Sequence, residues 1–208
     1  MSIVVCPVLP FPNIYWWSCI TSSSEIMVDK TEHFEKMSFR NRYLVAGADG
    51  IITLSIPVAD GRQQRKPMNE VRIDNKTNWQ IQHWRTLVSV YNRSPYFEFY
   101  RTELESLFLK KFEFLCDFNQ ESINVLTGLL RLKLNFQNTD SFIKHYPETV
   151  NDIRTAFRSN QYNLQPQLFK PYHQTFEERT GFFPNLSMLD LLFAEGRNAL
   201  SFLPDQQS

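Results

Sequence analysis

The sequence predicts an α/β fold in which a mixed β-sheet from the N-terminal third to half of the chain is packed by helices from the C-terminal half. Short β-branched and apolar runs bounded by turn residues fill roughly the first 75 positions. After them, apolar residues recur at helical spacing. The hydrophobic content of 42% and the length of 208 residues favour a chain that buries one core, as a single domain over residues 1–208.

Five segments predict strands. Residues 3–8 are a β-branched run that ends at a proline-rich turn, and residues 25–29 are a second short run. Residues 42–46 and 51–58 flank the sequence GADG, whose residues tolerate positive φ, so this region predicts a β-hairpin. Residues 71–73 are one further candidate strand.

Three consecutive helices and one short terminal helix are expected in the second half. The first begins at Gln80 and is ended by Pro95. Residues 97–114 and 120–132 continue the helical pattern. Residues 187–193 begin with a capping-box-like pattern and predict a short helix that docks on the core.

Charge and cysteine content indicate which partners are disfavoured and which cellular compartment is expected. The 22 basic and 22 acidic side chains balance, so no overall field attracts nucleic acid or an anionic membrane. Prolines at positions 7, 10 and 12 interrupt the apolar N-terminus, which predicts neither a membrane span nor a signal helix. Three widely spaced cysteines without a CxxC pair fit free thiols in the cytoplasm.

The common cofactor and catalytic signatures are absent from the sequence. It contains no GxGxxG, GxxxxGK[ST], HExxH or GxSxG pattern and no paired metal-ligand spacing. The sequence therefore predicts no metal and identifies no cofactor. It also does not indicate an oligomeric state.

Residues 36–42 are the most informative candidate for ligand binding. If this segment is extended, Lys36, Arg40 and Arg42 lie on one face of a strand and Asn41 lies on the other. Guanidinium groups form bidentate hydrogen bonds to phosphate or carboxylate, so such a face suits a small anionic substrate. The alternative is an ordinary solvated strand face.

Acid–base chemistry has three candidates. Asp29 and Glu32 lie just before the basic segment, where each serves either as a general base or as a salt-bridge partner. His83 lies near the start of the first predicted helix, where it is either a proton-transfer group or a hydrogen-bonded structural histidine.

Large aromatic residues follow two prolines. Trp16 comes after the N-terminal proline-rich turn and Tyr96 follows Pro95. Both are candidates for the floor of a sugar- or base-stacking pocket. Packing in the core is the alternative for each.

Four blocks of the sequence, in order, resemble the WbqC-like protein family: PVLPFPNIYWW, VDKTEHFEKMSFRNR, HWRTLVSVYNRSPYFEFY and GFFPNLSMLDLLFAEG. The resemblance covers most of the chain. Seven residues stand where the recurrent polar residues of that family fall: Asp29, Glu32, Lys36, Arg40, Asn41, Arg42 and His83.

The resemblance implies a role in surface-polysaccharide biosynthesis, because these proteins are associated with O-antigen (lipopolysaccharide) gene sets. It suggests an intracellular transferase that adds an acyl or aminoacyl group to a nucleotide-activated sugar. In that reading Lys36, Arg40 and Arg42 hold the anionic substrate while His83 or Asp29 moves a proton. The alternative is a non-catalytic protein that binds a small anion or a partner protein.

One departure from the family pattern bears on activity. Many members open with a His-x-Pro-x-Tyr type of turn, whereas no histidine precedes His33 in this sequence. If that histidine is catalytic in other members, this branch has lost or altered the activity.

Overall fold

The computed structural model describes residues 2–59, 66–158 and 166–205. Its strands are β1 (Ile3–Pro7), β2 (Glu25–Asp29), β3 (Arg42–Gly47), β4 (Gly50–Ser55), β5 (Phe136–Asn138) and β6 (Val150–Asp152). Its α-helices are α1 (Ile14–Thr21), α2 (Trp79–Tyr91), α3 (Phe97–Leu109), α4 (Leu115–Leu129), α5 (Glu177–Thr180) and α6 (Met188–Glu195). The predicted α/β class is confirmed.

Four strands form a parallel sheet in the order β5-β2-β1-β6. In its register Pro7 pairs with Asp29 and Val5 pairs with Asp152. The carboxyl ends of β1, β2 and β6 therefore meet at one edge of the sheet. Strands β1 and β2 were predicted, whereas β5 and β6 were not, because each has only three residues and is partly exposed.

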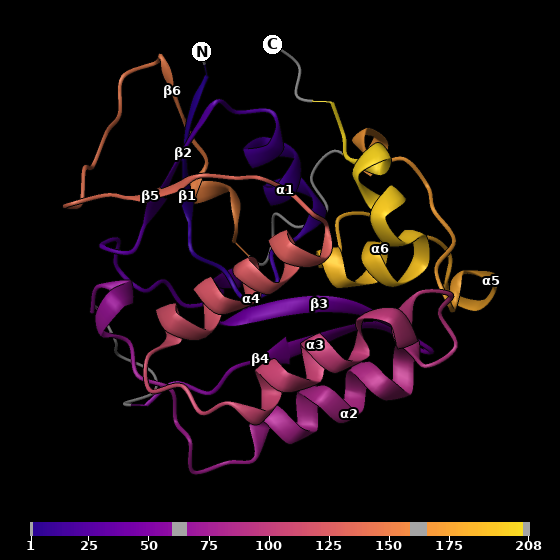
Figure 1. Cartoon of the computed structure of the whole chain (residues 1–208). Helices are drawn as coiled ribbons and strands as arrows, with labels where there is room; N and C mark the ends of the chain where they lie inside the picture. Colours follow the sequence, from indigo (N-terminus) through magenta and orange to yellow (C-terminus); the bar gives the residue numbers. More distant parts are fainter. Residues whose placement is uncertain (1, 60–65, 159–165, 206–208) are drawn as a thin grey trace.

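The second sheet is the predicted hairpin of β3 and β4. Figure 1 shows the parallel sheet and α1 in one part of the molecule, with the hairpin, α2 and α3 in another. Helix α4 lies between the two parts in that view. Residues 71–73 form only isolated bridges, through Arg72 and Ile73, and are not a regular strand.

Helix α1 was not predicted. Asn13 ends the proline-rich run and caps the helix, since its side-chain oxygen accepts a hydrogen bond from the backbone N–H of Trp16 at 3.0 Å. The Trp16 side chain is buried in the core, where its indole N–H donates to the carbonyl oxygen of Pro7 at 3.1 Å.

Residues 36–42 are not extended, so the condition for a single basic face is not met. Met37 has φ 56°, which reverses the chain in a turn. Ser38 then caps a short 3₁₀ helix (Phe39–Asn41), so β3 begins only at Arg42. The period of two on which the single basic face depended does not exist.

The last predicted helix is confirmed. Ser187 caps α6 by accepting a hydrogen bond from the N–H of Leu189 at 3.3 Å. Gly196 ends it with φ 60°, a conformation that favours glycine.

Candidate functional site

Five charged residues gather at the carboxyl edge of the parallel sheet; we call them the sheet-edge cluster. They are Asp29, Glu32, Arg40, Asp152 and Arg154. The chain passes from β1 to β2 on one side and later returns to β6 on the other side of β1, so the strand order reverses here. In parallel α/β sheets such a reversal, at the carboxyl ends of the strands, is the usual place for a ligand site.

Asp29, the last residue of β2, is fully buried and its carboxylate accepts several hydrogen bonds. Oδ1 accepts from the backbone N–H and the hydroxyl of Thr31, from the N–H of Glu32 and from the hydroxyl of Thr139. Oδ2 accepts from Arg154 at 2.6 Å. Burial opposes ionisation, but the hydrogen bonds from Thr31 and Arg154 outweigh it and lower the pKa of Asp29. Asp29 therefore stays ionised and organises the cluster.

Arg154 follows β6 and joins the ends of two strands. Its guanidinium donates to both carboxylate oxygens of Asp152, at 2.8 and 2.6 Å, and to Asp29. The guanidinium carbon also lies 5.3 Å from the ring centre of Phe142 and 5.0 Å from that of Tyr146. These cation–π contacts come from the segment between β5 and β6 and help to fix the charge in place.

Glu32 and Arg40 form a second buried pair. Nε and Nη2 of Arg40 donate to the two carboxylate oxygens of Glu32 at 3.0 and 2.6 Å. Helix α4 fixes the backbone of Arg40, because the side-chain amide of Asn119 in α4 donates to the backbone carbonyl oxygen of Arg40 at 2.8 Å. Burial raises the pKa of Glu32 to about 7, although the charge of Arg40 acts in the opposite direction.

The remaining nitrogen of Arg40, Nη1, faces Glu35. Nη1 is buried and forms no hydrogen bond among the residues that the structure describes. Nη1 forms an ion pair with the carboxylate of Glu35 at 3.5 Å, and Glu35 also pairs with Arg158 at 2.9 Å. Glu35 and Arg158 are 39% and 50% exposed, so the cluster reaches solvent on this side.

The structure places His83 apart from the sheet-edge cluster, between α2 and the hairpin. Nε2 donates to the carbonyl oxygen of Ser55 at 3.2 Å, and Nδ1 therefore accepts from the Tyr43 hydroxyl at 3.1 Å. Burial lowers the pKa of His83 to about 4, against the opposing effect of the hydrogen bond to Ser55. Both ring nitrogens are engaged, as expected of the structural alternative.

The predicted anion-binding residues do not converge. Lys36 is exposed in the turn, whereas Arg40 points into the sheet-edge cluster. The side-chain amide of Asn41 donates to the carbonyl oxygen of Ile56 at 2.9 Å and so fixes the end of the hairpin. Arg42 lies beside Met37, with 4.0 Å between Nη1 and the sulfur.

Tyr96 lies at a surface cleft of about 550 Å³ between α3, α4 and the end of α6. It is 39% exposed and its ring packs against Gly196, where a Cβ atom would come within 2.8 Å of it. Neither Tyr96 nor Trp16 contributes to the sheet-edge cluster.

Sequence reasoning missed Asp152 and Arg154. A signal was present, because Val28-Asp29 and Asn151-Asp152 both place an aspartate at the end of a strand. Without β6, however, nothing in the sequence brings Arg154 next to Asp29, which is 125 positions away.

The sequence model of the WbqC-like protein family matches residues 9–167, about three quarters of the chain. The chain belongs to the WbqC-like protein family. Every member of the sheet-edge cluster lies inside the matched segment of this WbqC-like chain, whereas α5 and α6 lie outside it. Comparisons with curated proteins and with solved structures gave no match.

No group of three or more His, Cys, Asp or Glu side chains in residues 2–59, 66–158 and 166–205 is arranged to hold a metal ion. No helix within those same ranges has the length and apolar character to cross a membrane.

Proposed function

We propose that this WbqC-like chain is a cytoplasmic enzyme of surface-polysaccharide biosynthesis that transfers an acyl or aminoacyl group to a nucleotide-activated sugar. The sheet-edge cluster is its proposed active site and Glu32 its proton-transfer residue. The observation that carries the proposal is a buried carboxylate with a pKa near 7 at the reversal point of a parallel sheet.

Glu32 is suited to act as a general base. A carboxylate with a pKa near neutrality is partly ionised at pH 7 and still basic enough to take a proton. In the proposed step, an amino or hydroxyl group of the sugar attacks the acyl carbonyl carbon. Glu32 takes the proton that the attacking group loses and passes it to the leaving group as the bond from the acyl carbon to that group breaks.

Arg40 has two parts in this proposal. Two of its nitrogens hold the Glu32 carboxylate in one orientation, which fixes the direction of proton transfer. An anionic group of the substrate replaces Glu35 at its remaining nitrogen, Nη1, which forms no hydrogen bond with the residues that the structure describes. Arg158 pairs with Glu35 at the exposed side of the cluster, where a phosphate would approach.

A non-catalytic anion-binding protein is the second candidate. The observation that favours it is the pairing of the buried carboxylates of Asp29 and Glu32 with guanidinium groups, an arrangement that also serves structure alone. The two candidates differ in the effect expected from changing Glu32. A binding protein needs the shape and hydrogen bonds of this side chain, whereas an enzyme also needs Glu32 to accept a proton.

Glu32→Gln is expected to lower the rate of acyl transfer at least about 100-fold, in the range usual for loss of a general base. The amide oxygen still accepts one of the two hydrogen bonds from Arg40, so ligand binding is expected to be retained. The purified chain is incubated with nucleotide-activated amino sugars and acyl-coenzyme A, and mass spectrometry detects the acylated sugar. Binding of the same sugars is followed by thermal shift.

His83→Gln is the matched control, because it changes a buried titratable residue outside the sheet-edge cluster. Its rate is expected to stay close to that of the wild type. A Glu32→Gln variant with the wild-type rate would contradict the proposed role of Glu32. Binding of nucleotide-activated sugars without product formation by the wild type would favour the binding protein.

A further inference from the structure

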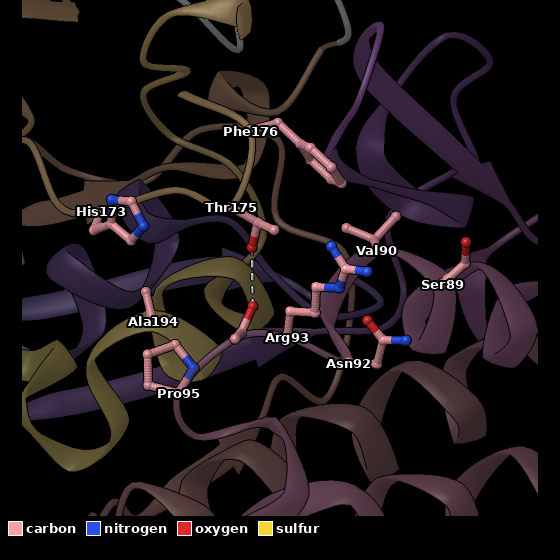
Figure 2. A pocket seen from close by; sticks show the side chains of 10 residues that line it. Ser89, Val90, Asn92, Arg93, Pro95, His173, Thr175, Phe176 and Ala194 are labelled. Carbon is pink, nitrogen blue, oxygen red and sulfur yellow. Dashed lines mark hydrogen bonds between the residues drawn. The ribbon is translucent and has the colours of Figure 1, made fainter. Parts of the chain in front are cut away.

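A second candidate site lies between α2, α6 and the segment before α5. It is a pocket of about 520 Å³ (Figure 2). We call it the α2–α6 pocket; its lining is Ser89, Val90, Asn92, Arg93, Ser94, Pro95, His173, Thr175, Phe176 and Ala194. In Figure 1 the α2–α3 turn and α5 lie on the opposite side of the molecule from the carboxyl ends of β1 and β2.

The polar side chains of one wall are free to bind a ligand. Asn92 and Arg93 follow the last residue of α2, and neither side chain forms a hydrogen bond or ion pair with any residue that the structure describes. Figure 2 shows the Arg93 guanidinium within the pocket, near Val90, with the Asn92 amide beside it. None of the lining residues is acidic, so the charge of Arg93 is not neutralised by the lining.

The opposite wall supplies hydroxyl, imidazole and aromatic groups. The Thr175 and Ser94 hydroxyls form a 2.9 Å hydrogen bond across the pocket, drawn as a dashed line in Figure 2. Phe176 presents a half-buried ring. The nearby carboxylate of Glu177 is held by His173 at 2.8 Å and by the N–H of Gln174 at 3.1 Å.

A buried hydrogen-bond network fixes the two walls relative to each other. Asp190 of α6 accepts from the hydroxyl of Tyr91 at 2.6 Å, from that of Tyr172 at 2.6 Å and from the side-chain amide of Gln174 at 2.8 Å. Tyr91 immediately precedes Asn92, and Gln174 lies next to Thr175. The polar groups of the pocket are therefore attached to rigid backbone, as a binding site requires.

From this arrangement we infer that the α2–α6 pocket binds a small hydroxyl-rich molecule that carries a phosphate or carboxylate, such as a sugar phosphate or an acidic sugar. Arg93 pairs with the anion, since a guanidinium matches the geometry of either group. The Asn92 amide and the hydroxyls of Ser94 and Thr175 bind the sugar hydroxyls. The Phe176 ring packs against the apolar face of the sugar. The site is separate from Glu32 and does not depend on the proposed transferase activity.

Calorimetric titration of the full chain with glucose 1-phosphate, glucuronate, glucose and inorganic phosphate tests the inference. Glucose 1-phosphate and glucuronate are expected to bind, and glucose is expected to bind at least about tenfold more weakly because it lacks the charge. Arg93→Ala is expected to weaken binding of both anionic sugars at least about tenfold. Arg85→Ala is the matched control, because Arg85 is also exposed on α2 but does not line the pocket.

Equal weakening by the Arg85→Ala and Arg93→Ala changes would show non-specific charge attraction and would overturn the inference. Unchanged affinity of the Arg93→Ala variant would do the same. Binding of inorganic phosphate as tight as that of glucose 1-phosphate would remove the part of the inference that concerns the sugar. The loss of affinity expected of Arg93→Ala separates this site from the sheet-edge cluster, because Arg93 lines the α2–α6 pocket and does not belong to that cluster.

Discussion

Arg154→Met is expected to lower the free energy of unfolding by about 3–5 kcal/mol, the usual cost of removing one partner of a buried ion pair. The change leaves Asp29 fully buried without its guanidinium partner, and it also removes the partner of Asp152 on β6. Urea denaturation of both proteins at pH 7 measures the difference. A loss of this size would show that Arg154 joins β2 to β6 energetically as well as geometrically.

Arg72→Met serves as the control for that experiment. Arg72 also pairs with a carboxylate, that of Glu113, but both side chains are more than half exposed. Exposed pairs contribute at most about 1 kcal/mol, so this variant is expected to stay close to the wild type. Similar losses for Arg154→Met and Arg72→Met would contradict the account of the cluster.

His83→Gln is expected to change the pH dependence of stability. The pKa of His83 is about 4 in the folded protein, against an ordinary value of 6.5 that applies to the unfolded chain. Between pH 4 and pH 6.5 the unfolded chain therefore binds one proton at His83 that the folded protein does not bind. His83 therefore lowers the free energy of unfolding by about 3 kcal/mol as the pH falls from 6.5 to 4. The His83→Gln variant lacks this titration. The difference in the free energy of unfolding, variant minus wild type, is therefore expected to be more positive at pH 4.5 than at pH 6.5.

Glu32 acts in the opposite direction. The pKa of Glu32 is about 7 in the folded protein, against an ordinary value of 4.5 that applies to the unfolded chain. Between pH 4.5 and pH 7 the folded protein therefore binds one proton at Glu32 that the unfolded chain does not bind. Glu32 therefore adds stability as the pH falls from 7 to 4.5, also by about 3 kcal/mol. The two contributions nearly cancel in the wild type, while other groups such as Asp190 contribute equally to wild type and variant.

Urea denaturation of the wild type, His83→Gln and Glu32→Gln at pH 4.5 and 6.5 separates these contributions. The two variants are expected to deviate from the wild type with opposite signs. Parallel pH dependence in all three proteins would show that neither residue has the shifted pKa assigned to it.

The sequence predicted those elements whose local pattern is strong. The runs that became β1 and β2 are apolar because both strands are largely buried, and the GADG turn identified the hairpin. The helical spacing located α2, α3 and α4, although α3 ends at Leu109 rather than near residue 114. Where a pattern is both local and repeated, the sequence alone is sufficient.

Elements that depend on distant contacts were not predictable in this way. Strands β5 and β6 have three residues each and are fixed only by pairing with β2 and β1. Residues 36–42 carry an alternating pattern, but the turn at Met37 removes the strand that would display it. The positive charges of this segment consequently point in different directions.

The candidate site was predicted in part. Asp29, Glu32 and Arg40 were singled out from their charges and their order in the chain, and the structure brings these three into one cluster. The choice between His83, Asp29 and Glu32 as proton-transfer residue depends on burial and on partners, which sequence does not provide. Asp152 and Arg154 required the position of β6.

A direct titration of the Glu32 side chain tests the central claim. Carbon-13 NMR of the labelled glutamate carboxyl groups follows each ionisation, and the signal absent from Glu32→Gln identifies Glu32. A midpoint near pH 7 is expected, because burial outweighs the pairing with Arg40. A midpoint at or below the ordinary value of 4.5 would mean that Arg40 keeps Glu32 ionised and would contradict its role as the proton-transfer residue.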